Sequence, residues 1–413
     1  MSRTEDKAGL HSGSSRPRLQ IKALAVAGAT ILGILLWVFA GFGPEPIPHL
    51  RPSNKTVRVL VHSRARSLEL RNEQGLRILI EDKEYAPQNQ YKLLQISPGP
   101  KGIQVRSPAP ASLDLSTRSL LIEWKGEALA RLDASETAQH WFGALVLKQG
   151  RQGMRVIPHI ELEHYLSGVL AREMSASFSP EALAAQAVAA RSYVLESMRR
   201  SQSRDYDVFG DQRSQVFSGI SKHPRILRAV AATQGLVLKQ NGRILRAYYS
   251  STCGGRTRDA HECMRDVPEG TMPSVECRGC IISAKTYRWT RQIAAEDWSL
   301  LGLAAPPTSV QLLEQSGRGD WKRLRLTAPI GPPVEVSGDK LRRELRLRSN
   351  WIEDLRKTGE GRVIYGRGFG HGVGLCQWGA EGYARQGWSW QSILQHYYPG
   401  AKIEYPGAKI ERD

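Results

Sequence analysis

Two segments far apart in the sequence, Glu163–Leu195 and Gly366–Gly400, each combine a turn rich in small residues with a few reactive side chains and a following helical pattern. In the first segment, Glu173 ends an apolar stretch just before a turn. A carboxylic acid that is anchored on rigid structure beside an irregular surface suits general acid catalysis. The alternative is a solvated loop carboxylate, because most charged side chains are exposed.

The element that must position Glu173 is the helix that follows it. Ser179-Pro180-Glu181 reads as an N-cap, a first-turn proline and an acidic first-turn residue. A helix of about five turns is expected from this start. Its apolar residues fall at three- and four-residue steps and predict one buried stripe, which consists of Leu183, Ala187, Ala190, Val194 and Met198.

The second segment alternates glycine with other residues from Gly366 to Gly374. Such a run permits close backbone approach and positive φ angles. It lacks the lysine-serine or lysine-threonine ending of a nucleotide-binding loop. His371 lies within this run, as a candidate site residue or as a structural histidine.

Cysteine and histidine supply a candidate metal site. Four of the five cysteines gather with His261 in one stretch that includes a CRGC pair, and the fifth is Cys376. Thiolate and imidazole ligands at this spacing suit tetrahedral zinc. Disulfides are the alternative outside the cytoplasm. No HExxH motif is present, which argues against a zinc peptidase.

The N-terminal region predicts a membrane anchor. Residues 1–22 are polar and basic, whereas residues 23–42 carry no charge and match the thickness of a bilayer in helical form. The basic flank places the N-terminus in the cytoplasm, so the bulk of a single-pass cell-membrane protein would be extracytoplasmic. The alternative is a cleaved signal ending near Ala40, which would give a secreted protein. Residues 43–55 are a proline-rich linker.

Short alternating or apolar runs after the linker predict strands. They occupy Thr56–Ser63, Ser67–Asn72, Leu76–Asp82, Tyr91–Ser97, Leu120–Trp124 and Gly143–Gln149. We expect a strand-rich accessory region over residues 56–150 and a site-bearing region over residues 151–405, with a flanking layer between Arg288 and Thr358. The expected fold class is mixed α+β, a strand-rich scaffold with central helices, preceded by one transmembrane helix.

The net charge of +18 does not indicate a nucleic-acid-binding protein. Lysine and arginine are dispersed along the chain rather than gathered in one stripe. An exported topology also argues against DNA. Lipid headgroups and wall carboxylates are the expected counter-charges.

Five blocks occur in order between Arg155 and Ile403, and together they carry a family resemblance. They are YLSGVLAREM, EALAAQAVAARSY, YYSSTCGGRT, GFGHGVGLCQWGAEGYA and ILQHYYPGAKI. The sequence resembles the stage II sporulation protein D family, peptidoglycan lytic transglycosylases whose relatives include amidase enhancers. Residues 151–405 would be the catalytic region.

The resemblance implies that Glu173 is the general acid and base, and that the substrate is the glycan strand of peptidoglycan. A lytic transglycosylase needs one carboxylate, because the C6 hydroxyl of muramic acid attacks the anomeric carbon and gives a 1,6-anhydro end. Peptide-free strands are the expected substrate. Leu170, Met174 and Phe178 would raise the pKa of Glu173, whereas Arg172 beside it would lower it.

The same resemblance implies a set of substrate-binding residues. Arg191 would grip a muramyl carboxylate or, alternatively, form a structural ion pair. Trp378 would stack on a pyranose face, and it stands with Cys376 where relatives typically carry tyrosine and serine. The full set is Arg191, Gln186, Tyr193, Ser251, His371, Gln377 and Trp378.

Some members of the resembled family hold zinc near the TCGG block. This implies Cys253, Cys277 and Cys280 as ligands, with His261 or Cys263 as the fourth. The zinc would be a structural staple rather than a catalyst. Apart from this ion no cofactor is expected. The main alternative function is a glycan-binding enhancer that activates a separate cell-wall amidase.

Overall fold

The computed structural model describes residues 50, 55–107, 113–202, 204–265, 267–359 and 361–406. The predicted basic tail, the predicted anchor at residues 23–42 and most of the linker lie outside these residues. Across the described ranges, no helix combines the length and apolarity that a bilayer crossing requires.

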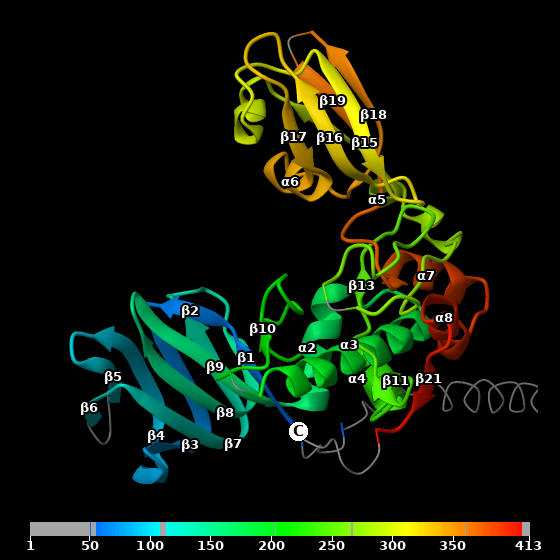
Figure 1. Ribbon diagram of the computed structural model, residues 1–413. Helices are drawn as coiled ribbons and strands as arrows, with labels where there is room; N and C mark the ends of the chain where they lie inside the picture. Colours follow the sequence, from blue (N-terminus) through cyan, green and yellow to red (C-terminus); the bar gives the residue numbers. More distant parts are fainter. Residues whose placement is uncertain are drawn as a thin grey trace, which may run out of the picture. The chain divides into compact units, whose positions relative to one another are not determined.

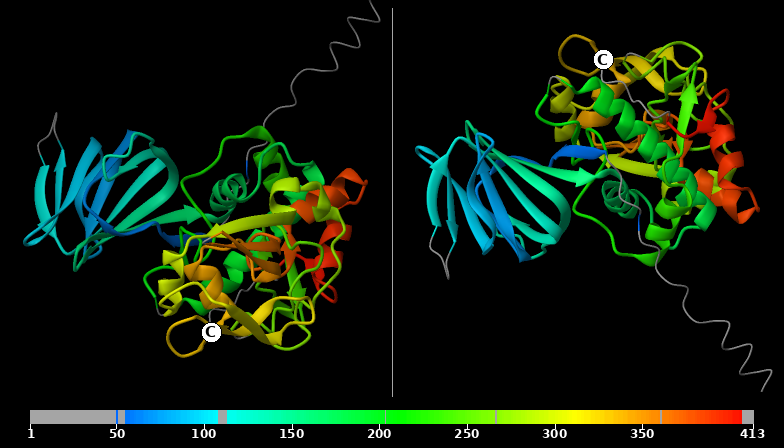
Figure 2. Two further views of the ribbon diagram at one scale, coloured as in Figure 1. Left: turned by 90° about the horizontal axis from the view of Figure 1, so that it is seen from above. Right: turned by 90° about the horizontal axis from the view of Figure 1, so that it is seen from below.

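The first half of the described chain is one curved sheet (Figures 1 and 2). Its strand order is β10-β1-β9-β8-β7-β3-β4-β5-β6, with β2 paired to β9, and only the β1–β10 pair is parallel. The strands are β1 Thr56–Leu60, β2 His62–Ala65, β3 Leu68–Ile80, β4 Lys83–Gly99, β5 Gly102–Ser107, β6 Leu113–Thr117, β7 Ser119–Leu132, β8 Gln139–Gly150, β9 Gly153–Glu161 and β10 Val208–Phe209.

The predicted strand alternation is confirmed, but two of the predicted strands form a single continuous strand. Ser67–Asn72 and Leu76–Asp82 both fall mainly within β3, because register shifts against β4 between Arg71 and Leu76 let the strand continue through the polar residues. Contacts of β4 with β9 and of β5 with β8 show that the sheet closes over its own apolar side chains.

Five helices follow the sheet or close the chain, and one of them is central. They are α2 Leu162–Glu173, α3 Pro180–Arg200, α4 Pro224–Ala232, α7 Gln377–Arg385 and α8 Trp390–Tyr397. Helix α3 begins at Pro180 as predicted and contacts the other four. It is buried on every side from Ala182 to Ser197, so the predicted apolar stripe is correct but covers only part of the buried surface.

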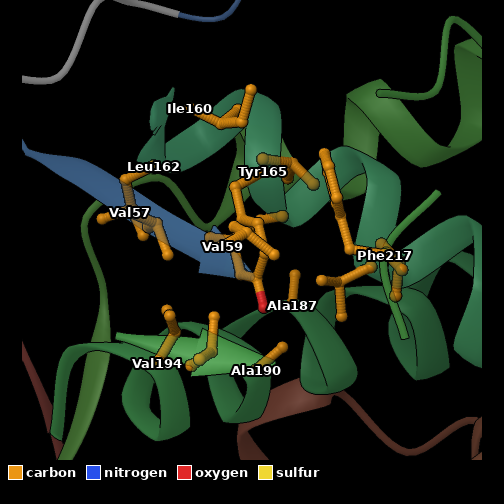
Figure 3. Packing of buried hydrophobic residues seen from close by; sticks show 14 of the residues in the cluster. Val57, Val59, Ile160, Leu162, Tyr165, Ala187, Ala190, Val194 and Phe217 are labelled. Carbon is orange, nitrogen blue, oxygen red and sulfur yellow. The ribbon is translucent and has the colours of Figure 1, made fainter. Parts of the chain in front are cut away.

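The sheet and the helices share one hydrophobic core (Figure 3). Val57 and Val59 of β1 pack with Tyr165 of α2 and with Ala187 and Val194 of α3. Small alanines let the helices approach closely, and the whole cluster is removed from water. Helix α2, which ends at Glu173, is therefore fixed from both sides.

Two short sheets bring distant segments together. Tyr249–Ser250 (β13) pairs in parallel with Leu375–Cys376 (β20), which joins the second block of reactive residues to the YYSSTCGGRT segment. The other sheet consists of β11 Val237–Gln240, β12 Arg243–Ile244 and β21 Lys402–Glu404. The short helix η1 Gly279–Ile282 contains Cys280, the last cysteine of the cysteine-rich stretch, and α5 Ala284–Tyr287 follows it.

Residues 288–367 have a hydrophobic core of their own, as the predicted flanking layer requires. It includes Trp298, Leu324, Leu341 and Ile364. Its strands are β14 Arg288–Ile293, β15 Ser309–Gln315, β16 Trp321–Thr327, β17 Val334–Ser337, β18 Trp351–Thr358 and β19 Gly361–Arg367, with η2 Glu296–Leu301 and α6 Gly338–Glu344. The mixed, strand-rich α+β class is confirmed for the described residues.

Candidate functional site

Glu173, the last residue of α2, is held by one group from each of two distant segments. Its Oε1 accepts a hydrogen bond from the Val216 backbone N–H at 3.3 Å, and its Oε2 accepts one from Gln377 Nε2 at 3.3 Å. Gln377 opens helix α7, immediately after β20. The two reactive segments singled out in the sequence therefore meet at this carboxylate.

The electrostatic surroundings of Glu173 favour its neutral form. The side chain is half-buried, and burial raises its pKa, while the hydrogen bonds from Val216 and Gln377 oppose that shift. No lysine, arginine or histidine among the described residues forms an ion pair with it. The neighbouring Arg172 is exposed. A carboxyl group with a raised pKa and no cationic partner is the form that donates a proton.

The residues predicted as apolar walls are buried. Leu170, Met174 and Phe178 are at most 6% exposed. Phe178 packs edge-on against Trp378, with ring centroids 4.8 Å apart. The Trp378 side chain remains partly exposed, and its backbone N–H donates to the carbonyl of Ser251 at 3.1 Å. Trp378 and Ser251 thus lie on adjoining segments of the same face.

A polar network that the sequence did not reveal lies beside Glu173. Gln215 is fully buried, and its Nε2 donates to Tyr249 Oη at 2.9 Å and to the Ala190 carbonyl at 3.2 Å. Tyr165 Oη donates to Gln215 Oε1 at 3.0 Å. Burial and the nearby charge of Glu173 raise the pKa of Tyr249 well above its usual value. Tyr249 is therefore a neutral hydroxyl held next to the carboxylate.

The sequence indicates only some of the residues in this network. Tyr249 belongs to the YYSSTCGGRT block, so it could have been included. Gln215 and Val216 stand in a loop without a recognisable pattern, and only the three-dimensional structure brings them to Glu173.

His371 is a neutral imidazole in this structure. Its Nδ1 accepts a hydrogen bond from the Val373 backbone N–H at 3.1 Å. Burial, followed by the charge of Arg342, lowers its pKa to about 4. Its ring meets the ring of Tyr248 edge-on at 6.0 Å. The imidazole also forms a hydrogen bond with the backbone of Tyr249, so it is well suited to hold the loop against that segment.

The glycine-rich loop adopts the predicted positive φ angles. Gly368, Gly370, Gly372 and Gly374 all have φ between 67° and 104°. At Gly374 a Cβ would lie 2.0 Å from the Tyr248 carbonyl oxygen, so only glycine permits the loop to approach this segment. The predicted contact of His371, which lies on this loop, with the glycan stays a prediction.

Arg191 forms a structural ion pair, which was the alternative to its predicted contact with a muramyl carboxylate. It is 0% exposed, and its Nε and Nη2 reach the two carboxylate oxygens of Glu163 at 3.0 and 2.6 Å. A side chain that is fully buried and doubly paired cannot contact a glycan. Gln186 is also 0% exposed, and Tyr193 is 5% exposed with its hydroxyl near Arg246 Nη2 at 3.3 Å. The predicted direct contacts of these three residues with substrate are therefore not supported.

Four cysteines form a compact buried cluster, but the fourth member is not the predicted one. The sulfur atoms of Cys253, Cys277, Cys280 and Cys376 lie within 4.8 Å of one another. The fourth position belongs to Cys376, which is far from the others in sequence. His261 is exposed and hydrogen-bonds the Val267 carbonyl at 3.0 Å, and Cys263 donates to the Asp259 carbonyl at 3.2 Å.

The cluster fits a tetrahedral thiolate site for zinc. All five cysteines are free, so no disulfide links the four, and Cys253 Sγ lies 3.7 Å from Cys280 Sγ. Zinc–sulfur bonds of about 2.3 Å in tetrahedral geometry place sulfurs about 3.8 Å apart. Hydrogen bonds from the other three thiols and from Tyr397 lower the pKa of Cys277, as expected where a thiolate is stabilised.

The cluster is joined directly to the carboxylate site. Cys376 Sγ caps helix α7, because it accepts the Gly379 N–H at 3.3 Å, and it also accepts the Cys253 N–H at 3.2 Å. Gln377, the next residue, donates to Glu173. The four-cysteine cluster thus anchors the helix start that carries a contact of Glu173.

Comparison with known proteins identifies the family. The family model described as "Stage II sporulation protein" matches residues 150–239. The stage II sporulation protein D of Bacillus subtilis is 31% identical over 273 residues, which cover 61% of this chain and 77% of that protein. The chain belongs to the stage II sporulation protein D family.

Two further relatives show the range of the family. An uncharacterized protein of Brachyspira hyodysenteriae is 31% identical over 270 residues, 64% of this chain and 72% of that protein. The amidase enhancer of Bacillus subtilis is 26% identical over 293 residues, 58% of this chain but only 40% of that protein. Membership of the stage II sporulation protein D family indicates a role related to the cell wall.

Proposed function

We propose that this protein is a peptidoglycan lytic transglycosylase that cleaves glycan strands between N-acetylmuramic acid and N-acetylglucosamine, with Glu173 as general acid and base. The observation that carries this proposal is the state of Glu173, a half-buried carboxyl group with a raised pKa and only uncharged hydrogen-bond donors. Family membership supports peptidoglycan as the substrate, and the state of the Glu173 carboxyl group supports its role as the catalytic acid and base.

The reaction needs only this carboxyl group. Protonated Glu173 donates its proton to the glycosidic oxygen as the bond to the anomeric carbon breaks, and the carboxylate then accepts the proton of the C6 hydroxyl as that oxygen attacks the same carbon. One glycosidic bond between sugars is lost and one intramolecular glycosidic bond, between O6 and the anomeric carbon, is formed without water. Ordinary glycosidases require a second carboxylate. Within the described ranges, no second acid shares a hydrogen bond with Glu173.

The groups around Glu173 have separate tasks in this proposal. Gln377 and the Val216 N–H orient the carboxylate and stabilise it after the proton has left. Tyr249, whose hydroxyl accepts from Gln215, keeps its own proton for a sugar oxygen or for Glu173. Ser251, His371 and Trp378 stay candidates for contact with the sugars.

We also propose one structural zinc ion held by Cys253, Cys277, Cys280 and Cys376. Bound zinc would offset part of the thiolate charge and would cross-link three segments, Cys253, Cys277–Cys280 and Cys376. Its role is to fix the start of α7, and thereby Gln377, relative to Glu173.

For localisation we propose a single-pass protein of the cell membrane with residues 56–405 outside the cytoplasm. The uncharged stretch at residues 23–42 and its basic flank support this proposal. The alternative is release after signal cleavage. Fractionation of cells followed by N-terminal sequencing distinguishes them, because a cleaved protein would be found outside the membrane fraction without its first 40 or so residues.

The second candidate function is a glycan-binding enhancer of a cell-wall amidase. It is supported by the 58% of this chain that aligns with the amidase enhancer of Bacillus subtilis. An enhancer would need the fold and the glycan contacts but not a proton-donating carboxyl group. The raised pKa of Glu173 favours the enzyme.

The test is glycan cleavage by purified full-length protein, by Glu173→Gln and by the control Glu136→Gln. Glu136 is an exposed residue outside the site. The enzyme requires that Glu173→Gln stops the release of soluble fragments from peptide-free strands while Glu136→Gln does not. If no variant cleaves peptide-free or peptide-bearing strands, but wild type and Glu173→Gln both accelerate an added amidase, the enhancer is the correct function.

A further inference from the structure

A pocket separate from Glu173 lies beyond the C-terminal end of α3. It has a volume of about 580 Å³ and is lined by the end of α3, the β11–β12 hairpin and the loop around Pro268. Its described lining contains five arginines and a single acid, Glu196. The arginines are Arg199, Arg200, Arg243, Arg246 and Arg265.

The single acid does not neutralise this pocket. Glu196 is shared by Arg199 at 2.9 Å and Arg200 at 2.8 Å. Over the part of the chain that the structure describes, Arg243, Arg246 and Arg265 have no carboxylate within ion-pair distance. A concave surface with such an excess of one charge concentrates ligands of the opposite charge.

Arg246 is held in a fixed orientation. Its guanidinium lies over the rings of Tyr193 and Tyr248, at 5.1 and 5.4 Å from their centroids, and its Nη2 donates to Tyr193 Oη at 3.3 Å. Its Nε is buried and makes no hydrogen bond within the described residues. A planar fork of donors held on two aromatic rings is pre-organised for a planar anion such as a carboxylate.

Contacts between aromatic side chains lead from the pocket toward the Glu173 site. Tyr248 lines the pocket, and its ring contacts His371 at 6.0 Å. Tyr193 contacts Tyr249 at 6.4 Å, and the pKa of Tyr249 responds to the charge of Glu173. The pocket thus shares its Tyr248 wall with the aromatic cluster that reaches Tyr249.

We propose that this arginine pocket binds the free lactyl carboxylates of peptide-free glycan strands, an inference that rests on the proposed function for the identity of the polymer. Removal of a stem peptide leaves a carboxylate on the muramic acid, so a peptide-free strand is a regular polyanion. On a peptide-bearing strand the same position is an uncharged amide. The pocket thus supplies the carboxylate grip that Arg191, being buried, cannot provide, and it selects strands already processed by an amidase.

The experiment measures binding without turnover. Full-length Glu173→Gln protein is titrated with fluorescent peptide-free glycan and with the same glycan after its carboxylates have been converted to amides. Two double variants in this background remove equal charge: Arg243→Ala with Arg265→Ala in the pocket, and Arg118→Ala with Arg151→Ala on exposed positions of the strand region. Poly(glycerol phosphate) serves as a phosphate polyanion for comparison.

The expected result is that the pocket variant weakens binding of the carboxylate glycan by about tenfold, since two charged contacts are lost. The control variant leaves binding unchanged, and the amidated glycan binds wild type and pocket variant equally. Equal effects of the two double variants would overturn the proposal, because they would indicate general charge attraction. Tighter, pocket-dependent binding of poly(glycerol phosphate) would also overturn it.

This outcome is separable from the fate of the proposed function. If the glycan binds in the pocket but Glu173 is not needed for cleavage, the pocket assignment holds and the transglycosylase proposal fails. If Glu173-dependent cleavage occurs in the protein with an intact Glu173 but the pocket variant binds the carboxylate glycan normally, the pocket assignment fails alone.

Discussion

The two ends of helix α2 carry the same residue type in opposite situations. Glu163, near its start, is 2% exposed and accepts hydrogen bonds from two of the three guanidinium nitrogens of a fully buried arginine, Arg191. Glu173, at its end, is half-buried and meets only neutral donors, Val216 N–H and Gln377. The first carboxylate is paired with a cation, whereas burial raises the pKa of the second. Only the second combines burial with the lack of a cationic partner, which are the surroundings that suit a proton donor.

This comparison separates stability from chemistry along one element. The Glu163–Arg191 pair joins α2 to α3, and Arg191 also donates to the carbonyls of Leu236 and Val230. It is a structural tie in the middle of the core. Glu173 contributes little to such ties and is free for a reaction.

Replacement of Glu173 by glutamine should reduce glycan cleavage by about 10²–10⁴-fold, the usual contribution of a general acid or base. The isosteric amide keeps the packing but cannot donate and accept the proton. Initial rates on peptide-free strands measure the effect, and circular dichroism checks the fold. A folded Glu173→Gln protein that retains more than half of the wild-type rate would show that the proton comes from another group.

Replacement of Glu163 by glutamine should have the reverse profile. It leaves a buried guanidinium without its counter-charge, and breaking such a pair costs about 3–5 kcal/mol of stability. Urea denaturation measures the loss, and cleavage per folded molecule should stay near wild type. A further substitution, Arg191→Met, should recover part of the stability. A Glu163→Gln protein that is as stable as wild type but inactive would contradict this prediction, because it would assign the reactive role to Glu163.

Loss of one cysteine of the cluster should weaken metal binding. Cys376→Ser should lower zinc affinity by about tenfold or more, since even loss of an outer contact of a metal ligand costs that much. The matched control is Cys263→Ser, because Cys263 lies outside the cluster. Zinc content after dialysis against graded chelator gives the result. Equal zinc loss in both variants, or no zinc in wild type, would remove the metal from the account.

Gln377→Leu should change the pH profile rather than abolish cleavage. The Gln377 hydrogen bond stabilises the charged form of Glu173, so its removal raises the Glu173 pKa further. Glu173 then stays protonated to higher pH, and the alkaline limb of the pH–rate profile shifts to higher pH. Gln386→Leu, an exposed change just beyond α7, is the control. An unchanged limb in Gln377→Leu, or an equal move in both variants, contradicts this assignment.

The smallest expected effect is on stability as a function of pH. Because burial raises the Glu173 pKa in the folded state, its ionised form destabilises the protein above that pKa, and the penalty vanishes below the unfolded value of about 4.3. Glu173→Gln should therefore have a higher melting temperature than wild type at pH 7, with the gain lost on acidification. A gain that is independent of pH would assign the effect to packing instead.

Much of the fold follows from local rules. The start of α3 at Pro180 and the strand alternation in residues 56–150 depend on neighbours in sequence, and both were predictable. The long strand β3 was divided because its bulged middle is polar, and only pairing with β4 and β7 shows its continuity. The region over residues 288–367 could be placed as a layer, but its separate core required the structure.

The site was predictable where a residue belongs to a sequence block and not where partners are distant. Glu173 and Gln377 come from such blocks and do meet. Arg191 also belongs to such a block, but its partner Glu163 lies 28 residues away in the sequence. Nothing in the local sequence distinguishes a buried ion pair from a contact with substrate. Cys376 joins the other three cysteines through the β13–β20 pairing, which no spacing rule contains.

The central claim is tested most directly by the chemistry of the new chain ends. Purified full-length protein and Glu173→Gln are incubated with peptide-free glycan in water enriched in heavy oxygen, and the soluble products are analysed by mass spectrometry. The account predicts 1,6-anhydro-muramyl ends without heavy oxygen, formed by wild type and not by Glu173→Gln. Reducing ends that contain heavy oxygen would contradict it, because they would require an activated water and a second catalytic group.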